Sequence, residues 1–397
     1  MKLLSINESN YGSTGRIMLS IAKFCQCDNI VAVSNSRSNK KENIDNCIYI
    51  GSRIGRNIHL LLYKYTGLNG CFSIIDTFIF LKKIKKYDPD IIHIHNLHNC
   101  FINLPLLFNF LKKNKYRVIW TLHDCWSFTG HCPHFINTKC YKWKNGCEHC
   151  ISYKEYPMSQ RDSSKKMWNL KKKWFSGVEN LTIVTPSTWL RDNLKSSFLN
   201  EYKAYTIYNG VDISVFRKND SNFRERKQIE SSKIVLLGVA YTWNDKKGLD
   251  VFCELANRLS EEYKIVLVGT NDEIDKMLPK AIISIHKTEN RRELSEIYSA
   301  ADLFINPTRE DTFPSVNMEA ICCGTKVITF DVGGCKETIN SNVGECVPVD
   351  RIDLLICAIE RWKNKDVPLN YFEQYRNSHD IKVCLNKYKE LIYEKKK

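Results

Sequence analysis

Short apolar runs alternate with amphipathic, helix-like segments along most of the chain. Five runs of strand length lie in its first half: Leu3–Ile6, Ile30–Ser34, Ile91–His95, Val118–Leu122 and Leu181–Pro186. The segments between them carry apolar residues at helical spacing. This alternation is typical of a parallel sheet in which each strand is followed by a crossover helix. We therefore expect an α/β, Rossmann-like domain in the first half.

The same alternation restarts in the second half, with strands expected at Ile234–Val239, Lys264–Gly269 and Lys326–Phe330. The polar segment Lys218–Ser232 has linker composition and is expected near the domain junction. We expect an amino-terminal domain at 1–215, a carboxyl-terminal domain at 216–380, and a final helical segment at 381–397 that can cross back to the first domain. Two such domains would face each other across a cleft.

A carboxylate pair, Glu310 and Asp311, follows a buried apolar run in the second half. Thr312 and Pro314 then predict the amino-terminal cap and first turn of a helix, and Glu319 lies in its second turn. Backbone N–H groups and acids would meet at one helix mouth. A polar ligand is expected there, because such mouths face the crevice of an open α/β sheet.

The alternation breaks at 125–157, in a loop rich in Cys, His and aromatic residues. Its pattern C-x7-C-x6-C-x2-C comprises Cys132, Cys140, Cys147 and Cys150. Four soft ligands suit a tetrahedral zinc ion, which would order a loop of this length. The spacing differs from that of common zinc fingers, so a structural zinc and free or redox-labile thiols both stay open.

The composition adds a basic charge to this picture. The 397 residues include 59 Lys and Arg against 44 Asp and Glu, a net charge of +15. Nucleic acid, anionic lipid or phosphorylated substrates would suit a basic face, and a dispersed lysine surface is the plainer alternative. The apolar runs are too short to span a bilayer, and the chain enters a strand at once, without a secretion signal. We expect a cytoplasmic protein, with a peripheral place at the inner face of the cytoplasmic membrane as an option.

Six motifs occur in the order Gly12–Arg16, His93–His98, Thr121–Trp126, Tyr208–Asp212, Lys247–Gly248 and Glu310–Glu319. Together they resemble the GT-B glycosyltransferases of the large retaining family four, in particular bacterial capsule, colanic-acid and O-antigen enzymes. The resemblance implies transfer of a sugar from a nucleotide-diphosphate sugar to a growing, lipid-linked polysaccharide or oligosaccharide. No cofactor for the chemistry and no nucleic-acid partner are expected.

The resemblance also implies roles for single residues. Asp311 and Glu319 match the family's paired acids, normally two glutamates, and would contact the donor sugar and the nucleotide ribose. Lys247 would lie at the donor pyrophosphate, and Lys246 can substitute for an arginine that the family places nearby and this chain lacks. His123 would orient the transferred sugar without acting as a nucleophile. The expected catalytic residues are thus His123, Asp311 and Lys247.

The wider expected site has a donor side and an acceptor side. The donor-binding residues are Gly15, Arg16, Lys246, Lys247, Glu310, Asp311, Thr312, Phe313 and Glu319. The acceptor-side residues are His95, Asn96, His98, Asp124 and Trp126. Gly12 and Gly15 would bracket a turn that lets a phosphate or sugar approach the following helix.

Plainer explanations exist for each of these residues. Acids at a helix start complement its dipole, adjacent lysines can be solvated, and histidines at strand ends more often form a polar network than a zinc site. Two other functions also stay open. One is a basic nucleic-acid-binding protein with a zinc loop, and the other is a sugar-nucleotide epimerase or phosphorylase on the same fold.

Overall fold

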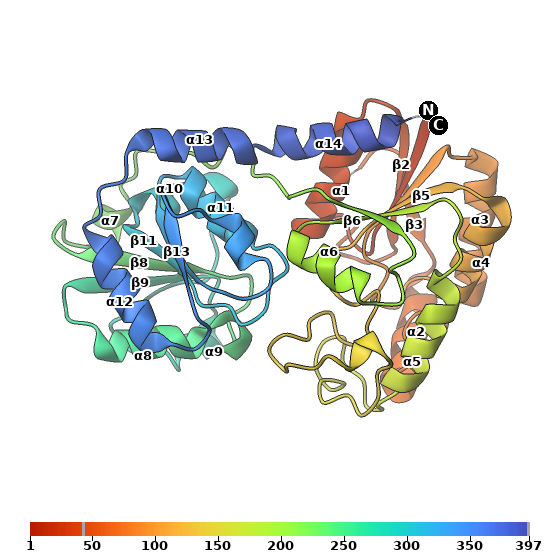
Figure 1. Cartoon of the computed structure of the whole chain (residues 1–397), viewed down its shortest axis with the longest axis horizontal. Helices are drawn as coiled ribbons and strands as arrows, with labels where there is room; N and C mark the ends of the chain where they lie inside the picture. The colour runs from red at the N-terminus through yellow and green to blue at the C-terminus, as the bar shows by residue number, and fades with distance from the viewer. Residues whose placement is uncertain (42–43, 395–397) are drawn as a thin grey trace. The chain divides into compact units, whose positions relative to one another are not determined.

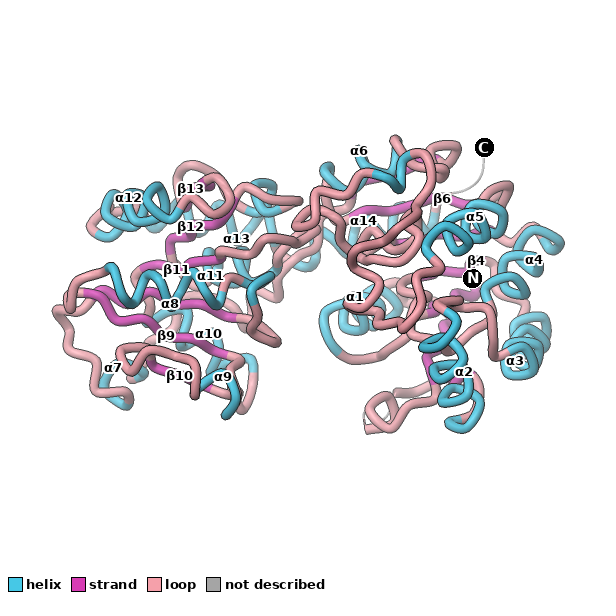
Figure 2. The backbone as a smooth tube through the Cα atoms, turned by 90° about the horizontal axis from the view of Figure 1, so that it is seen from below, coloured by secondary structure: helices cyan, strands magenta, loops and turns pink. Residues whose placement is uncertain are grey.

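The computed structural model describes residues 1–41 and 44–394, which form two compact units (Figure 1). The first unit comprises Met1–Tyr208 and Leu385–Lys397, and the second comprises Asn209–Cys384. Each unit is a parallel sheet with helices packed on it, as the tube in Figure 2 also shows. The predicted α/β class with two Rossmann-like sheets is confirmed.

The first unit holds a seven-stranded parallel sheet in the order β3-β2-β1-β4-β5-β6-β7. Its strands are β1 (Lys2–Ile6), β2 (Asp28–Ser34), β3 (Cys47–Ile50), β4 (Ile91–Ile94), β5 (Arg117–Thr121), β6 (Leu181–Thr185) and β7 (Lys203–Thr206). Its helices are α1 (Gly12–Phe24), α2 (Arg53–Thr66), α3 (Ile74–Tyr87), α4 (Leu104–Asn114), α5 (Ser164–Phe175), α6 (Thr188–Lys195) and the end of α14 (Ile381–Tyr393). The central strands read as continuous apolar runs because both of their faces are buried.

The second unit holds a six-stranded parallel sheet in the order β10-β9-β8-β11-β12-β13. Its strands are β8 (Ile234–Val239), β9 (Tyr263–Val268), β10 (Ile283–Ile285), β11 (Leu303–Asn306), β12 (Lys326–Phe330) and β13 (Gly344–Val347). Its helices are α7 (Phe223–Arg226), α8 (Leu249–Arg258), α9 (Asp272–Asp275), α10 (Arg291–Ala300), α11 (Ser315–Cys322), α12 (Ile352–Lys363) and α13 (Leu369–His379), with 3-10 turns η2 (Asp245–Lys247) and η3 (Cys335–Thr338).

Segment 218–232, predicted as a linker, is instead part of the second unit. Phe223 is buried in that unit's core, and Arg224 forms an ion pair of 2.6 Å with Asp302. The units divide between Tyr208 and Asn209. The polar composition of this segment therefore reflects its exposed face and not a free connection.

Two helix starts differ from the prediction. Helix α11 begins at Ser315 with Pro314 in the cap position, so Thr312 is not the cap. The Asp311 side chain accepts a hydrogen bond from the Phe313 N–H at 3.1 Å and holds the chain in a turn before the helix begins. Helix α1 already begins at Gly12, so Gly15 lies within it and not in a turn.

The last residues of α14 belong to the first unit. The Arg117 side chain at the start of β5 donates to the Ile392 carbonyl at 2.9 Å, and the Tyr388 hydroxyl lies 3.2 Å from Thr121 Oγ1. Across the residues that the structure describes, no helix combines the length and apolar character needed to cross a bilayer.

Candidate active site

The candidate residues gather where the strand order of each sheet reverses. The first sheet reverses between β1 and β4, and the second between β8 and β11. Open α/β sheets bind ligands outside the carboxyl ends of the strands at such a point. The chain after β8 and β11 carries Lys246, Lys247, Glu310 and Asp311, which we name the charged edge. The chain after β4 and β5 carries His95, His98, His123 and Asp124, which we name the histidine edge.

The charged edge consists of two lysine–carboxylate pairs. Lys247 Nζ lies 3.0 Å from Asp311 Oδ2, and Lys246 Nζ lies 3.1 Å from Glu310 Oε1. Lys247 Nζ also lies 3.5 Å from Thr308 Oγ1. The lysines come from the 3-10 turn after β8 and the acids from the loop after β11, so the sheet topology brings together residues 64 positions apart. The sequence predicted all four residues at one site but not that they pair with each other.

The electrostatics of these pairs keep the lysines charged. Burial lowers the pKa of Lys247, but the Asp311 carboxylate more than offsets it, and the net shift is upward. The lysine side chains are about one-third exposed, while Glu310 is 10% exposed. An anion entering this edge would meet ammonium groups that are already charged and positioned.

Two features fix the loop that carries the acids. The Arg309 guanidinium binds both oxygens of Asp250 at 2.8 and 2.6 Å and reaches Asp350 at 2.8 Å. Gly248 has φ +75°, and a Cβ there would lie 2.5 Å from the Pro307 carbonyl oxygen. Only glycine permits this backbone conformation and close approach without strain. Sequence reasoning missed Arg309, whose partners lie far from it along the chain.

The remaining donor-side residues of the second unit have unequal exposure. Glu319 lies on α11, and its Oε2 accepts a hydrogen bond from the Tyr298 hydroxyl at 3.3 Å. Thr312 and Phe313 are buried, at 6% and 5% exposure, and Phe313 belongs to the core. The Phe313 ring is therefore part of the scaffold of the charged edge, in contrast to its predicted contact with the donor.

The glycine motif of the first unit lies at the start of α1, directly after β1. Gly15 is buried, and a Cβ there would lie 2.5 Å from the backbone of Asn10. Arg16 is exposed on the same turn. Asn96 after β4 donates its backbone N–H to the Asn7 side chain at 3.0 Å, which joins the loops after β1 and β4. Because Gly15 has no side chain, helix α1 can pack closely against the loop that carries Asn10.

The histidine edge is a hydrogen-bonded network. His95 Nδ1 lies 3.0 Å from His123 Nε2, and their rings stack at 5.3 Å. His98 Nε2 lies 3.2 Å from Asp124 Oδ2, whose carboxylate also accepts the Trp126 backbone N–H at 2.9 Å. The interpretation of these histidines as a polar network is confirmed.

Burial keeps the inner histidines neutral. It lowers the pKa of His93 to about 3 and that of His123 to about 4, and it lowers the pKa of His95 as well. Among the described residues, the buried His95 Nε2 has no hydrogen-bond partner. His95 and His123 thus offer polar groups without positive charge.

Two residues that sequence reasoning missed support this edge. The Tyr156 hydroxyl lies 3.1 Å from His98 Nδ1 and donates to Asn99 Oδ1 at 2.8 Å. Asn99 has φ +75°, a conformation costly for a residue other than glycine. Lys171 is fully buried, donates to the Trp126 and Thr129 carbonyls at 2.6 and 3.1 Å, and lies 3.5 Å from the Trp126 ring centre.

Trp126 itself is 2% exposed. The ring packs between Lys171 and His98 inside the unit, and the contact of Trp126 with an acceptor stays a prediction. The sequence did not indicate this burial, because an aromatic residue directly after a strand can either contact a ligand or pack in the core.

The four-cysteine loop has little regular structure, only the 3-10 turn Lys142–Lys144. Burial raises the pKa of Cys132, and the neighbouring Cys150, Cys147 and Cys140 thiols raise it further, so the four lie in one neighbourhood. Gly130 donates its N–H to Cys147 Sγ at 3.1 Å. Within residues 1–41 and 44–394, no group of three or more His, Cys, Asp or Glu side chains is arranged to hold a metal ion. The zinc ion stays a prediction.

Two Rossmann-like units with polar edges at their reversal points define a GT-B fold. Residues 42–215 match the family described as Glycosyltransferase Family 4, and residues 219–379 match Glycosyl transferases group 1. The chain is therefore a glycosyltransferase that combines a Glycosyltransferase Family 4 domain with a Glycosyl transferases group 1 domain.

Its relatives include enzymes of bacterial surface glycans. The putative colanic acid biosynthesis glycosyl transferase WcaC of Escherichia coli K12 is 22% identical over 275 residues, 68% of this chain and 66% of that protein. The N,N'-diacetylbacillosaminyl-diphospho-undecaprenol alpha-1,3-N-acetylgalactosaminyltransferase of Campylobacter jejuni is 28% identical over 151 residues, 37% of this chain and 38% of that protein. The matches span less than two thirds of either relative's own length.

Solved structures share the fold over the whole chain. Anabaena HepE in complex with UDP-glucose superposes with a TM-score of 0.67 and 15% identity, covering 99% of each chain. At this identity the likeness establishes the fold and leaves the substrate of this chain to be argued from its site.

Proposed function

We propose that this glycosyltransferase moves a sugar from a nucleotide-diphosphate sugar to a growing, lipid-linked glycan, with retention of configuration at the anomeric carbon. The observation that carries the proposal is the charged edge, where two lysines and two carboxylates pair at the reversal point of the second sheet. Retention rests on the resemblance of the motifs to the retaining family four.

A nucleotide-diphosphate sugar complements the two lysines and the acids Asp311 and Glu319. The phosphate oxygens accept hydrogen bonds from Lys246 and Lys247, while the sugar and ribose hydroxyls donate to Asp311 and Glu319. Donor binding would thus exchange the internal ion pairs for contacts with the ligand. A carboxylate suits a diol because it can accept two hydroxyl protons at once.

Lys247 would also act in the transfer step. As the glycosidic bond breaks, negative charge grows on the leaving phosphate, and a fixed ammonium stabilises that charge more than it stabilises the ground state. His123 would contribute a neutral hydrogen-bonding group toward the transferred sugar, consistent with its lowered pKa. No proton has to be taken up by a histidine in this scheme.

The acceptor and the place of action are supported by the relatives. HepE was solved with UDP-glucose, and the name of the Campylobacter relative specifies a diphospho-undecaprenol acceptor. A lipid-linked acceptor would place this chain at the inner face of the cytoplasmic membrane. The basic charge of +15 would favour an anionic leaflet.

A structural zinc ion on Cys132, Cys140, Cys147 and Cys150 is a separate proposal, supported by the closeness of the four thiols. Metal analysis of the purified chain should find one zinc per chain, and Cys140→Ser should lose it. A metal-free chain that folds equally well would leave the thiols without this role.

The function is tested with a panel of nucleotide-diphosphate sugars, scored by thermal shift and by release of nucleoside diphosphate. One donor should raise the melting temperature, and transfer to a lipid-diphosphate-linked sugar should give a product with the anomeric configuration of the donor. An epimerised donor or phosphate-dependent release of a sugar phosphate would instead identify an epimerase or a phosphorylase. Salt-dependent nucleic-acid binding without sugar-nucleotide binding would point to the third class.

A further inference from the structure

Two neighbouring helices of the first unit expose an unusual amount of apolar surface. Helices α2 and α3 have 14 residues each. Among the residues that the structure describes, they carry nine of the 22 exposed large apolar side chains: Ile54, Ile58, Leu61, Leu62, Tyr65, Ile74, Ile75, Phe78 and Ile79. Exposed apolar side chains that gather in this way usually mark an interaction surface.

The exposed side chains of α2 follow a helical stripe. Ile54, Ile58, Leu61 and Tyr65 recur at spacings of four, three and four residues, and each is at least 53% exposed. The opposite side of the helix is buried through His59 and Tyr63. Helix α2 therefore has one face for its own unit and a second apolar face without a partner within the described chain.

Helix α3 continues this surface. The middle of α2 contacts the amino-terminal cap of α3, where His59 Nδ1 lies 2.7 Å from Ser73 Oγ. Ile75 and Phe78 are 74% and 54% exposed, while Phe80 and Ile84 are buried in the core. We name the exposed apolar side chains of α2 and α3 the apolar face.

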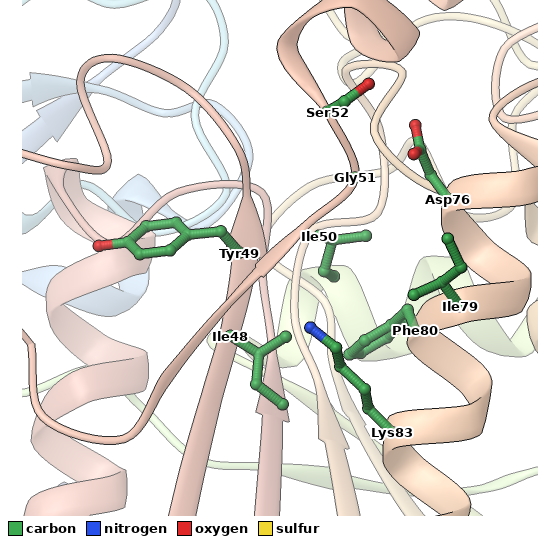
Figure 3. Close-up of a pocket in the computed structure, with 9 residues that line it drawn as sticks. All are labelled: Ile48, Tyr49, Ile50, Gly51, Ser52, Asp76, Ile79, Phe80 and Lys83. Carbon is green, nitrogen blue, oxygen red and sulfur yellow. The ribbon is translucent and has the colours of Figure 1, made fainter.

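A hollow of about 200 Å³ opens beside this face, between β3 and α3. Figure 3 shows Ile48, Ile50, Ile79 and Phe80 around it, with the Asp76 and Lys83 side chains coming from the same helix. Ile79 belongs both to the lining and to the exposed set. The hollow thus adjoins the apolar face at Ile79, and its lining is part apolar and part polar.

The charges around the apolar face have one sign. The exposed basic residues of the two helices are Arg53, Lys64, Lys82, Lys83, Lys85 and Lys86. Helix α2 contains no acidic residue, and the single acid of α3, Asp76, is half-buried. The Lys82 ammonium lies 4.7 Å from the Phe78 ring centre, so its stem runs along the apolar side chains.

We infer that the apolar face of α2 and α3 is a docking surface for an anionic lipid membrane. An amphipathic helix with aliphatic and aromatic side chains on one face and basic side chains beside them lies in the headgroup region of a bilayer, apolar side down. Each basic side chain near an anionic surface adds attraction. The inference rests on the proposed function in one respect, since a lipid-linked acceptor gives the docking its purpose.

Charge complementarity decides between lipid and the other occupants. A second copy seated on the same face would bring two sets of six exposed cations together, and such like-charge contact opposes association. An anionic leaflet supplies the opposite charge over the whole face and receives the isoleucine and phenylalanine side chains below its headgroups.

The test is co-sedimentation of the full chain with vesicles of phosphatidylcholine, with and without phosphatidylglycerol. The unsubstituted chain should bind the anionic vesicles and lose binding at high salt. The double variant Ile58→Ser/Phe78→Ser should bind at least about tenfold more weakly, because two large apolar side chains no longer enter the bilayer. The control Met277→Ser/Leu369→Ser removes equally exposed side chains of the second unit and should bind as the unsubstituted chain does.

Several outcomes would overturn the inference. The first is that the Ile58→Ser/Phe78→Ser variant binds vesicles as well as the unsubstituted chain does. The second is that the control variant loses as much binding as this variant. The third is that the unsubstituted chain shows no preference for phosphatidylglycerol. If the double variant instead turns a dimer into a monomer while no form binds vesicles, the face is an interface between copies.

Donor binding, followed by thermal shift with the nucleotide sugar, separates this inference from the proposed function. A double variant that keeps the donor shift but loses vesicles supports the docking surface. A chain that binds vesicles but no donor refutes the proposed function alone. Circular dichroism of each variant checks that these exposed positions leave the fold intact.

Discussion

The charged edge and the histidine edge occupy the same position in two similar sheets but handle charge in opposite ways. The charged edge keeps its lysines ionised by pairing them with Glu310 and Asp311. The histidine edge keeps the imidazoles of His95 and His123 neutral by burying them, which lowers their pKa values. A charged phosphate needs fixed ions, whereas neutral hydroxyls need hydrogen-bonding groups that carry no charge. One topology therefore supplies two kinds of site, and the side chains at the strand ends decide which.

The largest effect is expected from removing a fixed charge. Lys247→Ala should lower kcat/KM by about 10²–10³-fold, because the leaving phosphate loses its positioned cation and Asp311 loses its partner at 3.0 Å. Glu319→Ala should lower kcat/KM by a similar factor, because it removes the carboxylate expected to bind the nucleotide ribose. The measurement is release of nucleoside diphosphate at varied donor concentration.

Lys227→Ala, at an exposed position on the same unit, is the matched control and should retain full activity. Circular dichroism must show both site variants folded. Normal turnover in Lys247→Ala would remove the charged edge from the mechanism.

A change of pH should affect the two edges differently. The folded pKa of His93 is about 3, below the ordinary value of 6.5, so its contribution to stability is complete above pH 6.5 and is lost as the pH falls below that value. At pH 5 the unfolded chain takes up a proton that the folded chain does not, which costs about 1–2 kcal/mol. Urea unfolding at pH 7 and pH 5 measures this difference.

His93→Gln should lose less stability than the unsubstituted chain over the same range, since glutamine does not titrate. Hydrogen exchange should locate the loss in β4 and β5, while β8 and β11 keep their protection. Equal losses in both chains would show that His93 is not the residue responsible.

The sequence was sufficient to predict the two sheets and the sheet edges at which the candidate residues lie. Strands such as Ile91–Ile94 and Lys326–Phe330 are buried on both faces and are therefore mostly apolar, without strict alternation of apolar and polar residues. Once the parallel strands are known, the residues that follow them must lie at one edge of the sheet. His95, His123, Lys247 and Asp311 could be assigned to these edges on that ground.

The contacts within the edges could not be predicted in the same way. The partners of Lys247 and Arg309 lie 41 to 64 residues away in sequence, and loop conformation decides which of several nearby groups they meet. Tyr156 reaches His98 from a loop with almost no regular structure. The burial of Trp126 depends on Lys171, which lies on another element. Local patterns carry no information on such pairings.

The smallest expected effect separates the two acids of the charged edge. Asp311 pairs with the lysine assigned to the leaving phosphate and also shapes the turn before α11, whereas the Glu310 carboxylate pairs with Lys246. Glu310→Gln should therefore lower kcat/KM by only about 2–10-fold, because glutamine keeps a hydrogen-bond acceptor for Lys246 and loses only the charge, and Asp311→Asn should lower it more. If Glu310 acts only by holding Lys246, then Glu310→Gln in a Lys246→Met background should have no further effect, as a double-mutant cycle would show. A loss in Glu310→Gln that exceeds the loss in Asp311→Asn would instead make Glu310 the donor-binding acid, and the pairing of Asp311 with Lys247 would then be structural.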